Sequence, residues 1–204
     1  INTLVEISDI DNDNLNEIIV ANSTNIVLLD GYGNKVWAFN IENTPQELLI
    51  SQIEEDPSLE IVSLTGDSVW VINDNGGSPT SYFNQNIGST LYSIDSNDID
   101  NDGVNELFVG RSNGIAYLVD DTGGILWNYE YKGYANGGML ADDLDNDGKP
   151  EIVITHQDPN YIAYYDDNLD LKWKYSIRSY KFGAEDINND GYKEIIAVYG
   201  SNVY

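Results

Sequence analysis

Cysteine is absent from the 204 residues, which excludes a disulfide-stapled scaffold and zinc sites built on thiolates. Histidine occurs once, at position 156, and no cysteine, serine or acid partner for it can be identified in the sequence. We therefore expect His156 to be a loop residue without a catalytic role. No run of about 20 apolar residues exists either, so no membrane insertion is expected.

Basic residues are scarce: Lys and Arg together number 9 against 35 Asp and Glu, which gives a formal net charge of −26. A surface of this sign repels phosphate, which excludes nucleic acid as a partner, and it disfavours anionic membrane surfaces. The hydrophobic content of 41% is that of a chain that buries a core.

The acidic residues gather in a nine-residue motif. In residues 98–106 carboxylates occupy positions one, three, five and nine, and a glycine occupies position six. The motif recurs at 9–17, 143–151 and 186–194. Two carboxylates about 4 Å apart repel by roughly 4 kcal/mol at an effective dielectric near 20, so such a loop needs a cation. Hard oxygen donors around a turn glycine are what Ca²⁺ selects, and the four copies predict about four calcium sites.

The motif differs from the loop of an EF-hand. An EF-hand has an apolar residue at position eight and a bidentate Glu at position twelve that leads into a helix. Here the acid stands at position nine, and a run of Ile, Val, Leu or Phe follows it. The sequence therefore predicts nine-residue loops on β-hairpins.

The closing Glu marks an internal repeat. It falls at positions 17, 60, 106, 151 and 194, in steps of 43, 46, 45 and 43 residues. About 20 residues after each of the first four comes an aromatic residue that we expect to pack between neighbouring sheets: Trp37, Tyr82, Trp127 and Trp173. Between these landmarks lie short runs rich in Ile, Val, Tyr and Trp, bounded by Gly, Asn and Asp, which is the pattern of strands.

Four antiparallel strands per unit of about 45 residues are typical of a propeller blade. We predict an all-β chain, a β-propeller of four-stranded antiparallel blades, as a single propeller or a propeller fragment. The blades are expected at about 1–42, 43–86, 87–133 and 134–179, with a partial blade at 180–204. About four and a half blades do not close a ring in an obvious way. We favour a piece of a larger propeller over completion by self-assembly of two chains or pairing of the half-blade elsewhere.

The units resemble the FG-GAP/VCBS repeats of integrin-alpha-like β-propellers over essentially the whole chain. The Leu-Asp-x-x-Gly-x-x-x-Trp pieces also resemble PQQ-type repeats, which bears on the fold alone. The resemblance implies Ca²⁺ bound by side-chain oxygens at positions one, three, five and nine and by the backbone carbonyl at position seven. The implied ligands are Asp9, Asp11, Asp13, Leu15 and Glu17; Asp98, Asp100, Asp102, Val104 and Glu106; Asp143, Asp145, Asp147, Lys149 and Glu151; Asp186, Asn188, Asp190, Tyr192 and Glu194.

Three loops depart from that pattern. Asn188 is a neutral donor, so the last site should be the weaker one. Asn14 replaces the turn glycine of the first loop, and Asn tolerates a left-handed backbone. In the second unit Gln52 takes position one and Pro57, with its φ locked near −65°, takes position six. We expect no metal at 52–60.

The end of the blades opposite the calcium loops is predicted to bind a partner protein or a glycan. Loops on a rigid scaffold carry function, and Tyr and Arg are enriched at interfaces. A solvated rim is the alternative. The basic and aromatic residues expected there are Arg111, Lys132, Arg178, Lys181, Tyr131, Tyr134, Tyr161, Tyr180 and Phe182.

Weak calcium sites are filled at the millimolar levels found outside cells, which favours an extracellular or cell-surface location. We expect a non-enzymatic module for adhesion, recognition or cell-surface assembly. Two alternatives stay open: the propeller domain of a carbohydrate-active enzyme such as a polysaccharide lyase or hydrolase, and a purely architectural repeat in a surface filament or layer. No acid/base pair is recognisable outside the metal loops.

Overall fold

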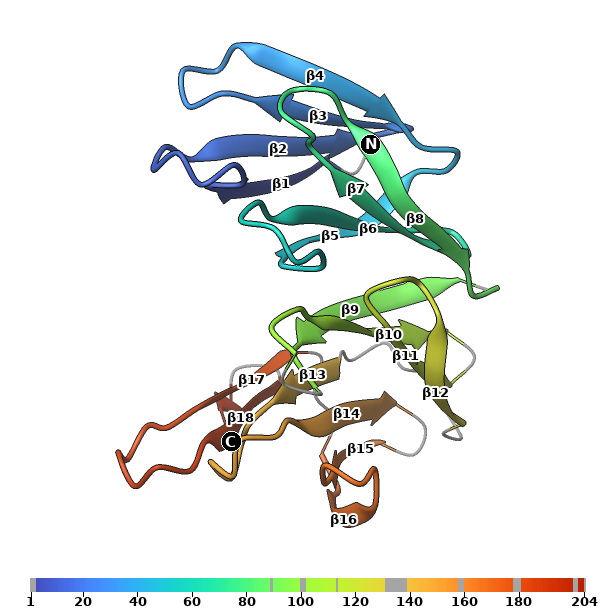
Figure 1. Cartoon of the computed structure of the whole chain (residues 1–204). Helices are drawn as coiled ribbons and strands as arrows, with labels where there is room; N and C mark the ends of the chain where they lie inside the picture. The colour runs from blue at the N-terminus through green and yellow to red at the C-terminus, as the bar shows by residue number, and fades with distance from the viewer. Residues whose placement is uncertain are drawn as a thin grey trace. The chain divides into compact units, whose positions relative to one another are not determined.

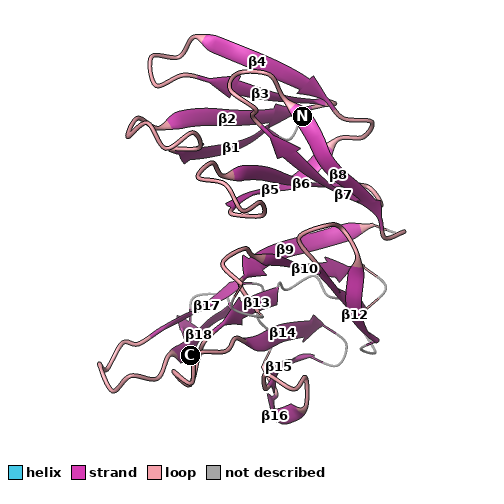
Figure 2. Ribbon diagram, viewed as in Figure 1, coloured by secondary structure: helices cyan, strands magenta, loops and turns pink. Residues whose placement is uncertain are grey.

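A computed structural model describes residues 3–88, 90–99, 102–112, 114–130, 139–157, 160–177, 181–199 and 202–203. Every regular element in these ranges is a β-strand (Figure 2). The described residues contain no helix that is long and apolar enough to cross a membrane. The prediction of an all-β chain is confirmed.

The strands form five antiparallel sheets whose strand order follows the chain (Figure 1). Four of the sheets have four strands, as predicted, and the fifth has three in the part that the structure describes. The first two sheets are β1 (Thr3–Ser8), β2 (Glu17–Asn22), β3 (Asn25–Leu29) and β4 (Lys35–Asn40), then β5 (Pro45–Ser51), β6 (Glu60–Thr65), β7 (Ser68–Asn73) and β8 (Thr80–Asn86). The others are β9 (Leu91–Asn97), β10 (Glu106–Arg111), β11 (Ile115–Val119) and β12 (Ile125–Glu130); β13 (Met139–Asp142), β14 (Glu151–Gln157), β15 (Asn160–Tyr165) and β16 (Leu171–Tyr175); and β17 (Lys181–Glu185), β18 (Glu194–Tyr199) and β19 (Asn202–Val203).

The chain divides into two compact units, Ile1–Leu91 with Asp120–Gly124, and Tyr92–Val119 with Ile125–Tyr204. In the first unit the buried core joins the first sheet to the second, with Ile19, Leu28 and Trp37 packed against Ile61 and Ile72. Two buried clusters lie among the described residues of the second unit. One joins β10 and β11 to β13, β14 and β15, and the other joins β14 and β15 to β18.

Burial along the strands explains the apolar runs in the sequence. In β2 buried residues alternate with half-buried ones, whereas every residue of β6 is buried. Alternation is the pattern of a strand covered on one face, and continuous burial is that of a strand covered on both. In β16, by contrast, all five residues are exposed.

The fourth strand of each four-stranded sheet begins with an irregularity that fixes the aromatic position. A register shift in the strand pairing leaves Trp37 opposite Leu28, and the same shift recurs at Trp127 and Trp173. In the second sheet Phe83, not Tyr82, occupies the equivalent place, opposite Val71. The prediction of Tyr82 was wrong because the connection from Val71 to Phe83 is three residues longer than the one from Leu28 to Trp37.

His156 lies inside β14 and is 1% exposed, so the expectation of a loop residue was wrong. Its ring stacks on Tyr161, with centroids 4.0 Å apart. Burial, with a smaller contribution from Lys174, lowers the pKa of His156 to about 4, so it is neutral at pH 7. The strand extends past the apolar run 152–154. Its next two residues, Thr155 and His156, are buried although they are polar.

Candidate metal centres

Each acidic loop connects the first strand of a sheet to the second, and its closing Glu is the first residue of the second strand. Glu17, Glu106 and Glu151 are buried there, and Glu194 is half-buried. A buried carboxylate at the start of a buried strand needs a compensating charge or several hydrogen bonds.

The loops at 9–17, 98–106, 143–151 and 186–194 share one hydrogen-bond pattern. The carboxylate at position one accepts the backbone N–H groups of positions five and six, as Asp9 does from Asp13 at 3.0 Å and Asn14 at 2.8 Å. The closing Glu accepts the N–H of position two at 2.8–3.1 Å in all four. In the other three loops the same two hydrogen bonds to the carboxylate at position one measure 2.9–3.2 Å. The loop is thus wound so that its acidic side chains point inward.

Two of the predicted sites have carboxylate oxygens that converge. One oxygen each from Asp9, Asp11 and Asp13 lie within 4.8 Å of one another, and so do oxygens from Asp143, Asp145 and Glu151. Such a set of hard oxygen donors matches the chemistry that Ca²⁺ selects. The remaining two loops keep the same backbone hydrogen bonds. Asp100 lies outside the described residues, and the amide of Asn188 donates to Glu194 Oε1 at 2.7 Å.

The electrostatics of these loops also call for a cation. Burial, together with Asp145 and Asp147, raises the pKa of Glu151 to about 7. The pKa of Glu17 is raised as well, mainly by burial and then by the neighbouring aspartates. Each such carboxyl is most stable in the fold with either a proton or a cation beside it, and a divalent ion relieves the whole cluster at once.

Position six of each loop has a left-handed backbone. Gly103, Gly148 and Gly191 have φ of 100°, 89° and 92°, and Asn14 has φ of 69°. This explains why asparagine replaces glycine there without loss of the turn. The ring of Pro57 cannot adopt such a φ, so the 52–60 loop must fold differently.

In that second loop a side-chain amide interacts with the backbone oxygens. Gln52 Nε2 donates to the carbonyls of Glu54, Asp56 and Ser58 at 2.5, 2.6 and 3.1 Å. Ser58 stands at position seven. The family resemblance implies that the backbone carbonyl at this position is a metal ligand in the other loops. The carboxylates of this loop are also occupied: Glu54 accepts from Asn73 Nδ2, and Asp56 Oδ1 accepts from the Ser58 N–H at 2.8 Å.

Replacement of Gln52 by alanine should destabilise the chain by about 2 kcal/mol, because three carbonyls lose a shared donor. Gln46→Ala, at an exposed position of β5, is the matched control and should change little. Urea unfolding with and without EDTA measures both variants. The loss at Gln52 should be the same in either buffer, and a loss that appears only with calcium present would contradict the amide's role.

Glu60 makes the second loop sensitive to pH. Burial raises the pKa of Glu60 from 4.5 to about 7. The hydrogen bonds from the N–H groups of Ile53 and Glu54 lower it by a smaller amount. The folded chain therefore binds a proton that the unfolded chain has lost, and stability declines as the pH rises from 4.5 to 7. Glu60→Gln should add about 3 kcal/mol at pH 8 and under about 1 kcal/mol at pH 5. Urea unfolding at both pH values measures the gain in stability, with Glu42→Gln at an exposed position as the control. An equal gain from Glu60→Gln at pH 5 and pH 8 would refute the prediction.

A cavity of about 380 Å³ borders the first candidate site. It is lined by that loop, by the β3–β4 turn and by the β7–β8 turn, including Asp11, Asp30, Tyr32 and Asp74. Beside it Trp37 Nε1 donates to Asp74 Oδ1 at 2.5 Å, a buried hydrogen bond between the first and second sheets. In the first unit Trp37 thus ties β4 of the first sheet to the β7–β8 turn of the second sheet.

Backbone hydrogen bonds join consecutive loops. The N–H of Leu59, at position eight, donates to the Ile10 carbonyl, at position two of the preceding loop, at 2.8 Å. Lys193 repeats this with Leu144 at 2.9 Å, and its ammonium pairs with Asp142 at 2.6 Å. Position eight of the 143–151 loop is Pro150, which has no N–H to donate.

Side chains bridge the sheets where Pro150 removes the backbone bond. Asp95 Oδ2 accepts the Ala141 N–H at 3.0 Å, and Asn97 Nδ2 donates to the Ala141 carbonyl at 3.1 Å. Burial raises the pKa of Asp95, and the hydrogen bond from Ala141, which lowers it, offsets only part of this effect. These two side chains connect β9 to β13.

At the opposite end of the strands the structure describes part of the predicted partner surface. Arg111 ends β10 and donates to the Tyr117 hydroxyl at 2.5 Å. Lys174 lies 4.7 Å from the Tyr161 ring centroid. Phe182 packs partly buried against the cluster around Leu144, so its assignment to an exposed surface was wrong. Tyr131, Lys132, Tyr134, Arg178, Tyr180 and the Lys181 side chain lie outside the described residues.

Sequence reasoning missed Tyr117 and Lys174 at this end. Both residues lie on neighbouring strands, and only the strand register brings them beside Arg111 and Tyr161. The alternation of Lys with aromatic residues in β16 was the available signal.

Comparison with known proteins finds a family match for the C-terminal part of the chain. Residues 143–197, which contain two of the acidic loops, match the model of the FG-GAP-like repeat. This part of the chain is therefore similar to an FG-GAP-like repeat. Comparison with curated protein sequences gives no significant match.

Solved structures similar to this chain are β-propellers of low sequence identity. Saccharomyces cerevisiae Sqt1 has 12% identity and a TM-score of 0.76, over 96% of this chain and 55% of its own. The V. cholerae biofilm matrix protein Bap1 has 24% identity and a TM-score of 0.61, over 85% of this chain and 28% of its own. An Agrocybe aegerita lectin that recognises non-reducing terminal N-acetylglucosamine has 15% identity and a TM-score of 0.61, over 95% and 60%.

This chain therefore spans less than two thirds of each of these three relatives. At such identities the likeness shows the fold, and what the relatives bind is a property of those proteins.

Proposed function

We propose that this chain is a calcium-stabilised, non-enzymatic propeller module that serves recognition, adhesion or assembly at the cell surface or outside the cell. The observation that carries the proposal is the acidic loop repeated on one hydrogen-bond pattern, with the oxygens of Asp9, Asp11 and Asp13 within 4.8 Å. Bound Ca²⁺ supplies charge compensation there, and the loop's own backbone N–H groups orient the carboxylates toward it.

Two considerations support the location. Loops of this kind bind calcium weakly, so they fill in fluids that hold millimolar calcium. Among the similar structures is a biofilm matrix protein. The net charge of −26 keeps such a module soluble, and calcium reduces its self-repulsion.

The binding surface is proposed at the strand ends opposite the acidic loops. In the second unit this end presents Arg111 with Tyr117 and Tyr161 with Lys174. Cationic and aromatic groups held on rigid strands suit contact with a protein or a glycan. A lectin among the similar structures adds weight to the glycan.

A glycan array probed with the chain in about 2 mM calcium tests the proposal. We expect binding that falls with Arg111→Ala and Lys174→Ala and persists with Lys35→Ala, an exposed lysine on β4. Loss of binding in EDTA should accompany loss of the fold. Unchanged binding by both variants would contradict this surface, and release of an unsaturated product from uronate polymers would contradict the non-enzymatic role.

A further inference from the structure

The second sheet, β5 to β8, has no positive charge of its own. The sequence contains no Lys or Arg between Lys35 and Arg111, and this interval includes all four strands and their loops. The three ion pairs that the structure describes lie in the second unit. The acidic residues of the second sheet and its loops are Glu47, Glu54, Glu55, Asp56, Glu60, Asp67 and Asp74. These carboxylates therefore attract a partner that supplies the cations.

The outer strand of this sheet, β8, is an uncharged edge. It stands last in the order of the sheet and, among the described strands, pairs with β7 alone (Figure 1). Its residues are Thr, Ser, Tyr, Phe, Asn, Gln and Asn, and five of the seven are exposed. The absence of charge extends over residues 75–94. The edge follows from the strand order of a complete four-stranded sheet in the middle of the chain.

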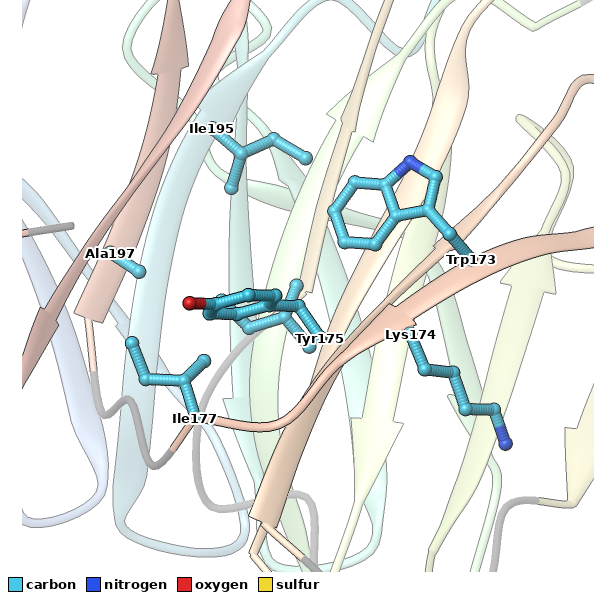
Figure 3. A pocket seen from close by; sticks show the side chains of 7 residues that line it. Trp173, Lys174, Tyr175, Ile177, Ile195 and Ala197 are labelled. Atoms are coloured by element: carbon cyan, nitrogen blue, oxygen red, sulfur yellow. The ribbon is translucent and has the colours of Figure 1, made fainter.

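The other outer strands carry charges that hinder pairing at their edges. Natural proteins place charged side chains, Lys above all, on exposed strand edges for this purpose. Lys35 begins β4, and Glu130 ends β12. β16 carries two lysines, and Figure 3 shows Lys174 extending from that strand away from Trp173 and Tyr175. β8 has no charge of this kind, so its edge is a template for strand addition.

Acidic groups stand at both ends of the uncharged edge. At its start Thr80 pairs with Asn73, whose side-chain amide donates to Glu54. At its end Asn86 Nδ2 donates to Asp67 Oδ2 at 3.0 Å. This hydrogen bond is the main cause that lowers the pKa of Asp67, so the carboxylate is ionised at pH 7. A neutral strand edge bounded by carboxylates is complementary to a segment with a neutral middle and basic ends.

We propose that β8 binds an extended segment of a partner protein by strand addition, and that this segment has an uncharged middle and Lys or Arg at each end. Its backbone would pair with Phe83–Asn86, the regular part of β8 beyond the register shift at Tyr82. Its cations would pair with Glu54 and Asp67. A second copy of this chain fits less well, because it would bring carboxylates to carboxylates. The surface is separate from the strand ends proposed above, and it makes no use of calcium.

A labelled peptide, Lys-Lys-Thr-Val-Thr-Val-Thr-Lys-Lys, is the probe. Fluorescence anisotropy with the whole chain in about 2 mM calcium should show saturable binding that weakens as salt is added. A peptide with proline in place of both valines keeps every charge but cannot complete the strand pairing, so it should bind at least about tenfold more weakly. Glu54→Gln with Asp67→Asn in the chain should weaken binding of the first peptide about tenfold, because two charge pairs are lost.

Controls separate the β8 edge from general attraction to an acidic chain. Glu6→Gln with Glu42→Gln removes the same charge from exposed positions of the first unit and should leave the affinity unchanged. Arg111→Ala with Lys174→Ala should also leave it unchanged, which separates this result from the fate of the surface proposed above.

Three outcomes would overturn the proposal. The first is the absence of saturable binding. The second is equal binding of the proline peptide, or an equal loss from the control pair of glutamates, which would reduce the effect to net charge. The third is self-association of the chain, measured by sedimentation velocity, that Asn84→Lys abolishes, which would assign the edge to a second copy.

Discussion

Removal of calcium is expected to lower the melting temperature of this chain more than any single substitution discussed above. A ligand that binds only the folded state adds about 2.7 kcal/mol per site at a hundredfold excess over its dissociation constant. Four such sites would add about 10 kcal/mol, which is comparable with the whole stability of a typical domain. Thermal melts followed by circular dichroism in calcium and in EDTA measure the difference.

A matched variant assigns the shift to the loops. Asp98→Asn with Asp102→Asn removes two carboxylates from one loop and should abolish about a quarter of the calcium-dependent shift. The control variant replaces the corresponding positions of the second loop, Gln52 and Asp56, by alanine. It should leave the calcium-dependent shift of the melting temperature intact, because the amide of Gln52 already interacts with the carbonyls of that loop. A melting temperature that does not move with EDTA would end the calcium proposal.

The second large effect is expected at the aromatic position of the first sheet. Trp37→Ala should cost about 4 kcal/mol, because it empties a buried site and leaves Asp74 without its indole donor. Trp173→Ala, at the equivalent position of the fourth sheet, should cost under about 1 kcal/mol, because its ring is 41% exposed.

Urea unfolding of the two variants provides the comparison, with intrinsic fluorescence and circular dichroism as independent probes. Since the two tryptophans lie in different compact units, the transition that moves should differ between the variants. Equal losses would show that the two positions are not packed differently.

The sequence predicted the repeat and the acidic loops well because both depend on local features. A nine-residue loop closed by its own Asp and Glu side chains is specified by residues that lie within seven positions of each other. The left-handed turn at Asn14 was likewise predictable from the residue type.

The errors arose where distant residues decide the outcome. The connection between β7 and β8 has three extra residues in the strand register, which places Phe83 and not Tyr82 at the aromatic position, and only strand pairing reveals this. His156 is buried by Tyr161 on the next strand, which a lone polar residue in a sequence does not indicate. The Gln52 amide was visible as a departure from the motif, but its three carbonyl partners required the folded loop.

The backbone link between consecutive loops has a consequence for how ions distribute along the chain. Leu144 donates its N–H to Glu151 within its own loop and accepts the N–H of Lys193 from the next. An ion that drew Glu151 into place would therefore also orient Leu144, whose carbonyl accepts the hydrogen bond from the neighbouring loop. On the calcium proposal, the occupancies of the 143–151 and 186–194 sites would then be coupled, as between neighbours in a linear lattice. Pro150 has no N–H for the corresponding link to the 98–106 loop, so we expect no such backbone coupling between the sites at 98–106 and 143–151.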